Sequence, residues 1–594
     1  METEAPYREV WELRADTFKH QTALEAMSKA AKSVGVGNFK TMYAAFEKSM
    51  RKENALDYTP HTTDFQNQKI ELDVGDWEAD DMGVRRGSGN FEEVACPHPI
   101  AVTERIVNVD TGLVKMLVEW RRGKRWNKTI VPRETLASAR EIVKLSGLNI
   151  SVNSRTAPFL CDYFMDLETL NYDRIPERMS VGRLGWIEGH GFSPYVPGLV
   201  YDGDANYAAM FDAIREHGSF DTWLTAARNF RRESVTARII LAASFASVLV
   251  RPLGALPFFV HLWGVDSSTG KTVALLAAAS VWGNPEMGKY VRTFDGTDVG
   301  YERAAAFLNS LPMCIDELQL ARNNRGQVVF NPYKLAQGAG RSRGNKNGGI
   351  DATPTWACAF LTTGESPLTT LVSGAGAINR VIEVECTSTE KVVSDGRTAV
   401  APFKKNYGFA GHRFVEKLDE AGVKRAEDLY NRAFEVLNAG DTTDKQAIAA
   451  ALCVAADQLA TEWIFKDDLA LTADEISRFL ATRASVSTGA RGYQYMCDWV
   501  ATNANKFKAD IEQGDVYGLL DDDWCYIIGS VFRSTCEEAG FNYQALLSYL
   551  SGEALIKKSS DGKNLVVKKI GKVSTRCVCM VIKYDAYDSE EREY

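Results

Sequence analysis

The chain has 594 residues, of which 45% are hydrophobic and 25% are charged, and its formal net charge is −9. This length predicts several domains, and the composition argues against a disordered or fibrous protein. The acidic balance excludes a uniformly basic protein that coats nucleic acid, although positive charge can still gather locally.

Neither the cysteines nor the apolar stretches indicate export or a membrane. The eleven cysteines lack metal-site spacing, so we expect reduced thiols in a cytoplasmic protein. The acidic start of the sequence has no signal-peptide pattern. The longest apolar stretch, residues 239–250, is too short to cross a bilayer and predicts a buried helix.

The first third of the chain changes from a helical to a strand pattern. Residues 1–55 are helical in pattern, and residues 57–90 are polar with little periodicity, which predicts a linker or an irregular segment. Strands are expected from residue 101 on. Two of them enclose a basic tip with Arg121, Arg122, Lys124, Arg125 and Lys128, beside Trp120 and Trp126. Such a tip either contacts single-stranded nucleic acid or is a solvated hairpin with its tryptophans in the sheet.

A helical stretch over residues 220–250 leads to the most specific motif of the chain. An apolar strand runs into a Gly/Ser loop that ends in Gly-Lys-Thr at the start of a helix. Small residues let backbone N–H groups surround phosphates, and the helix start adds a positive dipole end. The alternative is a chance Gly-Lys-Thr in an ordinary turn. The predicted nucleotide-binding residues are Gly264, Asp266, Ser267, Ser268, Thr269, Gly270, Lys271 and Thr272.

Two of these residues have defined chemical roles. We expect Lys271 to reach the β- and γ-phosphates of ATP and Thr272 to offer its hydroxyl to Mg²⁺. The usual spacing requires glycine where Val265 stands, and Gly264 is one place earlier. This spacing indicates a loop that is one residue longer than the standard form, and it leaves the role of Gly264 open.

An acidic pair follows at the end of a short apolar run over residues 310–317. We expect Asp316 to hold Mg²⁺ and Glu317 to orient the attacking water. Alone, such a pair often marks only a strand end that meets solvent. Behind a phosphate-binding loop it predicts an ATPase.

The segments around these motifs alternate between strands and helices, which predicts a parallel α/β sheet covered on both faces. Further strands are expected over residues 289–294, 356–361 and 380–385, and helices over residues 297–309 and 332–337. A glycine-rich insert near residues 338–349 carries Arg341, Arg343 and Lys346. We expect these cations to contact nucleic-acid phosphates, and a flexible solvated loop is the alternative.

The remaining segments follow the core. Residues 403–483 are helical and predict a lid-like bundle over the nucleotide. Two helices, over residues 526–538 and 542–551, precede a strand at 555–558 and a lysine-rich hairpin, which is a winged-helix pattern. The alternative is a small packing domain whose lysines keep an edge strand soluble.

The order of these motifs resembles the AAA+ ATPase core. More closely, it is similar to the phage- and mobile-element ATPase family related to the MCM-like helicase of staphylococcal cassette elements. The motifs that carry the resemblance are residues 267–272, 295–297, 316–318, 362–365 and 379–381, together with the glycine-rich basic insert. The resemblance implies that Thr363, or its neighbour Thr362, is a sensor at the end of the fourth strand. It also implies that Arg380 is an arginine finger that reaches a neighbouring subunit's nucleotide, although a structural arginine is the alternative.

The expected fold is therefore an α/β AAA+ P-loop ATPase core with a parallel sheet. Helical and β-rich N-terminal regions precede it, and a helical lid and a winged-helix-like C-terminal domain follow. The expected domains are residues 1–55, 56–219, 220–402, 403–483 and 484–594.

We expect an ATP-dependent DNA helicase of the AAA+ MCM-like type. The resemblance implies a hexamer that acts on single-stranded or forked DNA during replication of a phage or mobile element, with the insert in the ring pore. One alternative is an ATP-switched initiator or loader that binds DNA without processive unwinding. Another is a motor that acts on protein, whose ATP hydrolysis would be indifferent to DNA.

Overall fold

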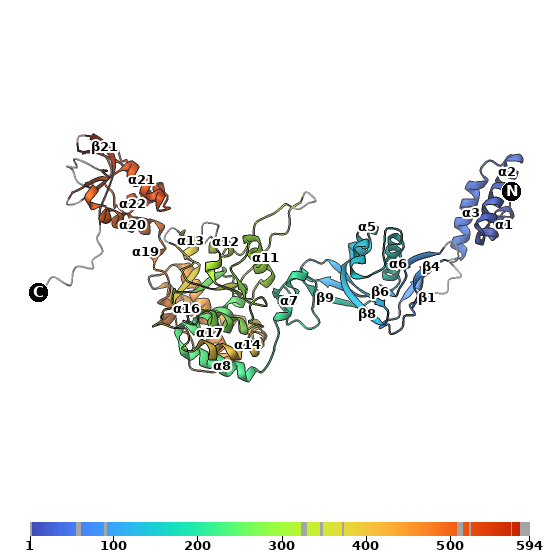
Figure 1. Cartoon of the computed structure of the whole chain (residues 1–594), viewed down its shortest axis with the longest axis horizontal. Helices are drawn as coiled ribbons and strands as arrows, with labels where there is room; N and C mark the ends of the chain where they lie inside the picture. Colours follow the sequence, from blue (N-terminus) through green and yellow to red (C-terminus); the bar gives the residue numbers. More distant parts are fainter. Residues whose placement is uncertain are drawn as a thin grey trace. The chain divides into compact units, whose positions relative to one another are not determined.

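The computed structural model forms two compact units, and Figure 1 gives their elements. The first unit comprises Met1–Gly182 and Pro197–Asp202, and the second comprises Arg183–Val196 and Gly203–Tyr594. The structure describes residues 3–54, 61–87, 92–321, 330–344, 349–370, 373–507, 515–521, 524–571 and 573–582.

The first unit begins with the predicted helices, α1 (Ala5–Glu12), α2 (Thr17–Ser33) and α3 (Phe39–Asn54). Their apolar side chains form a small core of their own. In it, the rings of Tyr7 and Phe39 stack with their centroids 4.8 Å apart. The helical pattern therefore reflects one buried face on each helix.

The second part of this unit is built on a five-stranded sheet with the order β12-β9-β6-β7-β8. Helix α6 (Ala157–Leu170) packs against β6 and against the short strands before it. Small helices α4 (Arg133–Leu136) and α5 (Ala139–Ile142) follow β8. The strands are β1 (His61–Thr62), β2 (Asp73–Gly75), β3 (Glu78–Asp80), β4 (Gly83–Arg86), β5 (Glu93–Cys96), β6 (Ile100–Asn108), β7 (Val114–Arg122), β8 (Arg125–Pro132), β9 (Glu177–Val181) and β12 (Val200–Tyr201).

The prediction of a linker over residues 57–90 was wrong for the described residues 61–87. They form β1 to β4, and Leu72, Val74 and Trp77 are fully buried in the core. The Trp77 indole N–H also donates to Asp166 of α6 at 2.9 Å. Strands of two to four residues are too short to produce a periodic pattern, so they could not be recognised in the sequence.

The basic hairpin tip between β7 and β8 has a mainly structural character. Arg121 is buried, and its guanidinium pairs with Asp81 at 2.8 Å. Trp120 lies in the core and Trp126 packs at its edge. This arrangement favours the solvated hairpin, although the tip also exposes Lys124, Arg125 and Lys128.

The second unit contains a parallel five-stranded sheet with the order β14-β15-β16-β13-β17. Helices α9 (Val235–Ala246) and α10 (Lys271–Ser280) pack on it, and α11 (Asp298–Leu308) begins at the predicted Thr297 cap. Four of the strands are strongly buried, as expected for parallel strands. The five strands of this sheet are β13 (Phe258–Trp263), β14 (Arg292–Thr293), β15 (Met313–Asp316), β16 (Ala359–Gly364) and β17 (Val381–Glu385).

Two predicted strand boundaries were wrong. The strand predicted over residues 289–294 contains only Arg292–Thr293, because a turn closed by a Met287–Val291 bridge precedes it. The strand predicted from residue 356 begins at Ala359. Before it, Trp356 donates its indole N–H to the Leu335 carbonyl at 2.7 Å and lies outside the ladder.

Helices surround this sheet before and after it in sequence. The predicted helical regions over residues 220–250 and 403–483 are helical in the structure. A short hairpin of β10 (Gly185–Ile187) and β11 (Gly191–Ser193) opens the unit. The other helices of this region are α7 (Ala205–Ala213), α8 (Phe220–Glu233), α12 (Pro332–Leu335), α13 (Ala375–Ile378), α14 (Gly396–Lys405), α15 (Phe409–Glu416), α16 (Glu420–Asn438), α17 (Asp444–Ala460), α18 (Ala473–Ser477) and α19 (Arg483–Val486).

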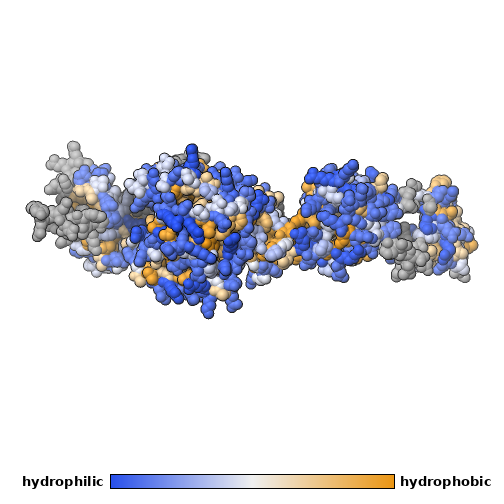
Figure 2. All heavy atoms as spheres, turned by 90° about the horizontal axis from the view of Figure 1, so that it is seen from below, coloured by the Kyte–Doolittle hydropathy of each residue, from blue (hydrophilic) through white to orange (hydrophobic). Residues whose placement is uncertain are grey.

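Helix α17 is the central helix of this region and packs against α9, α16 and β17. The stretch Asp444–Phe465 is apolar and long enough to cross a membrane by composition alone, but 72% of its most apolar window is buried inside the protein. Such burial is usual for a core helix. Figure 2 shows that hydrophilic residues cover most of the visible face and that hydrophobic residues form small patches.

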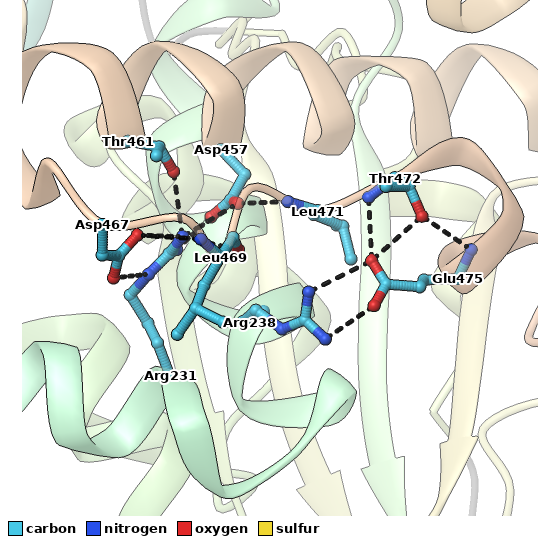
Figure 3. A network of polar contacts seen from close by, with 9 residues as sticks. All are labelled: Arg231, Arg238, Asp457, Thr461, Asp467, Leu469, Leu471, Thr472 and Glu475. Carbon is cyan, nitrogen blue, oxygen red and sulfur yellow. Dashed lines mark hydrogen bonds and ion pairs between the residues drawn. The ribbon is translucent and has the colours of Figure 1, made fainter.

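A buried charge network joins α8 to the end of α17 (Figure 3). The side chain of Arg231 is fully buried, and its guanidinium pairs with Asp457 and, at 3.1 Å, with Asp467. It also donates to the Thr461 hydroxyl and the Leu469 carbonyl, each at 2.9 Å. These contacts satisfy a cation that would otherwise be costly to bury.

The C-terminal part of the unit has two helices followed by a hairpin, as predicted, and the cysteines, all within the described residues, are buried and form no disulfide bonds. The predicted helix over residues 526–538 starts only at Gly529, because Cys525–Ile528 is a strand paired with β21. The predicted strand over residues 555–558 contributes only one bridge, Ile556 with Met580. The elements are α20 (Thr488–Thr502), β18 (Gly518–Leu520), β19 (Cys525–Ile528), α21 (Gly529–Glu538), α22 (Tyr543–Gly552), β20 (Val566–Ile570) and β21 (Val573–Met580).

Replacing Arg231 by methionine should destabilise the second unit by about 3–5 kcal/mol, because Asp457 and Asp467 would stay buried without their cation. Chemical denaturation measures this loss as a change in the free energy of unfolding. Arg425 is the matched control, since its pair with Glu462 is exposed (44% and 50% for the two side chains). Arg425→Met should cost less than about 1 kcal/mol. Equal losses would contradict a special role for the buried network.

Candidate functional site

The candidate site is a cavity at the edge of the parallel sheet where β13, β15 and β16 end. Its volume is about 610 Å³. Carboxyl ends of parallel strands meet at one edge, so loops that are distant in sequence converge there. The predicted residues that line the cavity are Gly264, Asp266, Ser267, Ser268, Thr269, Gly270, Lys271, Thr272, Asp316, Glu317 and Thr363.

The loop of residues 264–272 needs glycine at two positions, Gly264 and Gly270. Gly264 has a φ of +153°, and a Cβ there would lie 2.3 Å from the Cys386 carbonyl oxygen. Gly270 has a φ of +94° and caps the start of α10. The close approach to Cys386 gives Gly264 a structural reason to be glycine, which the motif spacing alone had left open.

Lys271 folds back over this loop. Its Nζ donates to the carbonyls of Gly264 and Asp266, both at 2.8 Å, and to the Thr269 hydroxyl at 3.2 Å. The Lys271 ammonium therefore lies at the cavity wall, and its hydrogen-bond acceptors there are two carbonyls and a hydroxyl, all of them neutral. A bound anion could replace these acceptors without leaving a buried carboxylate unpaired.

The Asp316 carboxylate accepts hydrogen bonds from two other predicted site residues. The hydroxyl of Thr272 donates to its Oδ1 at 3.2 Å, and the hydroxyl of Thr363 donates to the same oxygen. Thr363 also accepts from the backbone N–H of Glu317 at 3.2 Å. Of the two adjacent threonines proposed as sensor, Thr363 is therefore the one at the cavity.

The other threonine, Thr362, faces away from the cavity towards His261 of β13. Nδ1 of His261 lies 2.8 Å from the Thr362 hydroxyl, and Nε2 lies 2.9 Å from the Ser366 carbonyl. Because a carbonyl only accepts, Nε2 carries the hydrogen and the neutral Nδ1 accepts from Thr362. Burial lowers the pKa of His261 to about 4.

Glu317 follows the end of β15 in a left-handed conformation, with a φ of +64°. A non-glycine residue in this region is strained by about 1 kcal/mol or more. The strain turns the chain directly after Asp316, so that Glu317 is exposed at the cavity while Asp316 is buried. The two adjacent acids therefore have different surroundings.

The sequence reasoning missed a segment after β17, residues 386–397, that crosses the 264–272 loop. Its Val392 N–H donates to the Thr269 carbonyl at 2.8 Å. The Ser388 N–H donates to the Asp266 carboxylate at 2.8 Å, so that side chain holds the segment. This segment brings Lys391 and Arg397 to the cavity. The only sign of this segment in the sequence was the presence of two basic residues shortly after the last predicted strand of the sheet.

The donor set fits a divalent cation that arrives with a nucleotide. Thr272 Oγ1 and Asp316 Oδ1 are 3.2 Å apart, and Mg²⁺ usually takes one or two protein oxygens beside phosphate and water. Within the described residues, no cluster of three or more His, Cys, Asp or Glu side chains forms a separate metal site. These two oxygens are therefore the best candidate ligands.

Arg380 lies at the opposite edge of the sheet from this cavity. It directly precedes β17, whose five residues span about 16 Å. The residue is 8% exposed, and its guanidinium lies over the Tyr333 ring, 5.1 Å from the centroid. Its Nε has no hydrogen-bond partner among the described residues. In this conformation Arg380 does not reach the cavity of its own chain.

The basic insert forms two antiparallel arms between α12 and β16, with bridges Ala339–Thr355 and Gly344–Ile350. Arg341 is exposed, and Arg343 pairs with the buried Glu302 of α11 at 2.6 Å. Lys346 lies outside the described residues. The structure thus holds one predicted cation against the core and leaves another at the surface.

Two family models match parts of this chain. Residues 75–355 match the model described as a domain of unknown function, DUF927, and residues 487–585 match the Cch helix-turn-helix domain. A comparison with curated proteins finds no match.

Among solved structures, the chain is similar to the structure described as "SCCmec type IV Cch - active helicase", with a TM-score of 0.63 and 18% identity. The match covers 87% of this chain and 98% of that one. Two structures of the NrS-1 C-terminal region have TM-scores of 0.30 and 0.28, identities of 10% and 8%, and cover 82% and 81% of this chain and 97% and 96% of theirs. The Cch match confirms the expected resemblance at the level of the fold.

Stability should fall as the pH drops from about 6.5 to about 4, because the folded state resists protonation of His261 and the unfolded chain does not. We expect this residue to contribute about 2 kcal/mol between pH 7 and pH 4.5. Chemical denaturation at both pH values measures the difference. His261→Gln should remove that part of the pH dependence, whereas replacement of the exposed His190 by Gln should leave it unchanged. An unchanged slope in His261→Gln would contradict the assignment.

Proposed function

We propose that this chain, which shares the fold of the Cch helicase and carries a Cch-type helix-turn-helix region, is an ATP-dependent DNA helicase of the AAA+ MCM-like type. The observation that carries the proposal is the convergence at one cavity of Lys271, Thr272, Asp316, Glu317 and Thr363. The spacing of these residues in the sequence predicted ATP hydrolysis. In the fold they lie together because they are at or just after the carboxyl ends of neighbouring parallel strands. The domain boundaries given above and a cytoplasmic location are part of the same proposal.

In the proposed site, each side chain has one task. Lys271 would neutralise charge on the β- and γ-phosphates, and Thr272 and Asp316 would provide oxygen ligands to Mg²⁺. Glu317 orients the attacking water from its exposed position, and Thr363 holds Asp316 and the Glu317 backbone in register. Bound Mg²⁺ would neutralise the charge that develops on the phosphates during transfer.

Assembly completes the proposed site. Because Arg380 lies at the sheet edge opposite its own cavity, it can serve only a neighbouring subunit's nucleotide or the fold itself. A ring, and by resemblance a hexamer, would place it at the neighbour's phosphates, where an arginine stabilises the transferring group. Its Nε has no hydrogen-bond partner among the described residues, which supports a role that needs another chain.

DNA contact is proposed at two places. The arms around Arg341 and Arg343 would line the ring pore and grip a single strand. The helix-turn-helix region would contact duplex DNA through α22 and the lysines of the hairpin that follows it. That region also favours the second candidate function, an ATP-switched initiator or loader, because a helix-turn-helix can mark a site without unwinding it.

Lys271→Ala should abolish tight ATP binding, because the charge that faces the phosphates is lost. Glu317→Gln should still bind ATP but lose turnover by about a hundredfold or more, since only the water-orienting carboxylate changes. Equilibrium binding of labelled ATP and phosphate release measure the two effects. Glu286→Gln, an exposed substitution outside the cavity, is the control. Normal turnover in Glu317→Gln would remove the acidic pair from the mechanism.

The three insert cations Arg341, Arg343 and Lys346 should couple hydrolysis to DNA. Their joint replacement by alanine should keep basal ATP hydrolysis but reduce its stimulation by single-stranded DNA and the unwinding of forked DNA. Each lost phosphate contact should lower the salt dependence of binding by about 0.7 log units per log of salt.

The matched control is a triple alanine variant of the exposed cations at the other hairpin tip, Lys124, Arg125 and Lys128. If that variant loses unwinding and the insert variant does not, the residues that contact the single strand lie in the first unit instead. ATP hydrolysis that ignores DNA in the unmodified protein would favour a motor that acts on protein.

A further inference from the structure

The backbone around Arg380 is held by a helix from a distant part of the chain. Arg380 follows α13 and precedes β17, so the carbonyls of Ile378 and Val381 flank it. Both carbonyls accept from the side-chain amide of Gln446, at 2.6 and 2.8 Å. Gln446 lies in the first turns of α17 and is 1% exposed. One amide nitrogen thus bridges the two sides of the arginine.

The orientation of that amide follows from its partners. Two carbonyl oxygens require two N–H donors, and the Gln446 NH₂ group supplies both. Its Oε1 is buried and has no hydrogen-bond partner among the described residues. A leucine or methionine could fill the same space without this cost. The polar side chain is therefore explained by the two carbonyls and not by packing.

A second contact from the same helix turn acts on the same segment. The hydroxyl of Thr443, the N-cap residue of α17, donates to the Asn379 side chain at 2.5 Å. The segment of residues 378–381 is thus held at three points, residues 378, 379 and 381, by two side chains. The Arg380 side chain makes a weak 3.4 Å contact with the Gly376 carbonyl and lies over the Tyr333 ring, while its backbone carbonyl accepts from the Phe259 N–H of β13 at 2.7 Å.

We propose that Gln446 is a positioning residue for Arg380, supported by Thr443. Gln446 holds the backbone on both sides of Arg380. From that fixed backbone, the Arg380 guanidinium would move away from the Tyr333 ring and reach the nucleotide of an adjacent subunit. This inference rests on the proposed ATPase function. It adds that helix α17 of one subunit sets the catalytic competence of the next subunit's site.

The structure connects the nucleotide cavity of a chain directly to the Arg380 of the same chain. Strand β17 begins next to Arg380 and ends at Glu385, where the segment that crosses the chain's own cavity begins. A displacement of that segment by a bound nucleotide would act on β17 and on its partner helix α17 together, because the two elements pack against each other. Gln446 is the hydrogen-bonded link between them at the arginine end.

The test compares Gln446→Met with Arg380→Ala in the full-length protein. Gln446→Met keeps the length of the side chain and removes both donors. We expect kcat for ATP to fall about tenfold or more, towards the value of Arg380→Ala, with the affinity for ATP unchanged within about twofold. The double variant should be no slower than Arg380→Ala alone, because the two residues act as one unit. Gln458→Met, a partly exposed glutamine of the same helix, should retain normal turnover.

Mixed assemblies give the decisive readout. Gln446→Met subunits mixed with Glu317→Gln subunits should regain hydrolysis, because some interfaces combine an intact Glu317 with a correctly held Arg380. A mixture of Gln446→Met with Arg380→Ala should not. Thr443→Val provides a milder variant of the same defect if Gln446→Met folds poorly.

Three results would overturn the inference. They are normal kcat in Gln446→Met, loss of ATP binding together with turnover, and recovery in the mixture with Arg380→Ala. Failure of the proposed function would look different, because the unmodified protein would then hydrolyse no ATP and both ideas would fall together.

Discussion

The constraint on which the second unit depends is the common direction of the five parallel strands of its sheet. Parallel strands place their carboxyl ends at one edge, so the 264–272 loop, Asp316 and Thr363 meet although they are far apart in sequence. The same direction places Arg380, before β17, at the other edge. One sheet therefore separates the residues that would bind a nucleotide from the arginine that would act on a neighbour's nucleotide.

The helical region is tied to this sheet more firmly than a hinged lid would be. Arg231 joins α8 to α17 through buried charges, and Arg238 of α9 pairs with Glu475 of α18 at 2.7 Å. Because unpairing a buried charge is costly, we expect α8, α9 and α17 to move as one body. The segment over the cavity, residues 386–397, is held by backbone contacts, by Asp266, and by Glu233 and Ser234 where α8 meets α9. It is the part best placed to respond to a nucleotide.

Much of the site could be predicted because its chemistry is local in sequence. Gly270, Lys271 and Thr272 are consecutive, and Asp316 ends a visibly apolar run, so residue type and spacing were sufficient. The choice between Thr362 and Thr363 could not be made, because strand alternation fixes opposite faces but not which face meets the cavity. The short strands of residues 61–87 were missed for a related reason, since a period of two needs more than a few residues.

The contacts that could not be predicted join residues that no local pattern connects. Arg343 looked like a free cation in a glycine-rich loop, but Glu302 of α11 faces it, and the position of α11 depends on the whole sheet. Gln446 carried no signal, because a glutamine in an alanine-rich helix is ordinary until two carbonyls are placed beside it. Motifs thus identify the atoms that touch a ligand, whereas the residues that aim those atoms emerge only from tertiary packing. If the proposed site is shared between subunits, residues such as Gln446, which position the ligand-contacting side chains, would determine whether nucleotide binding at one site affects the next.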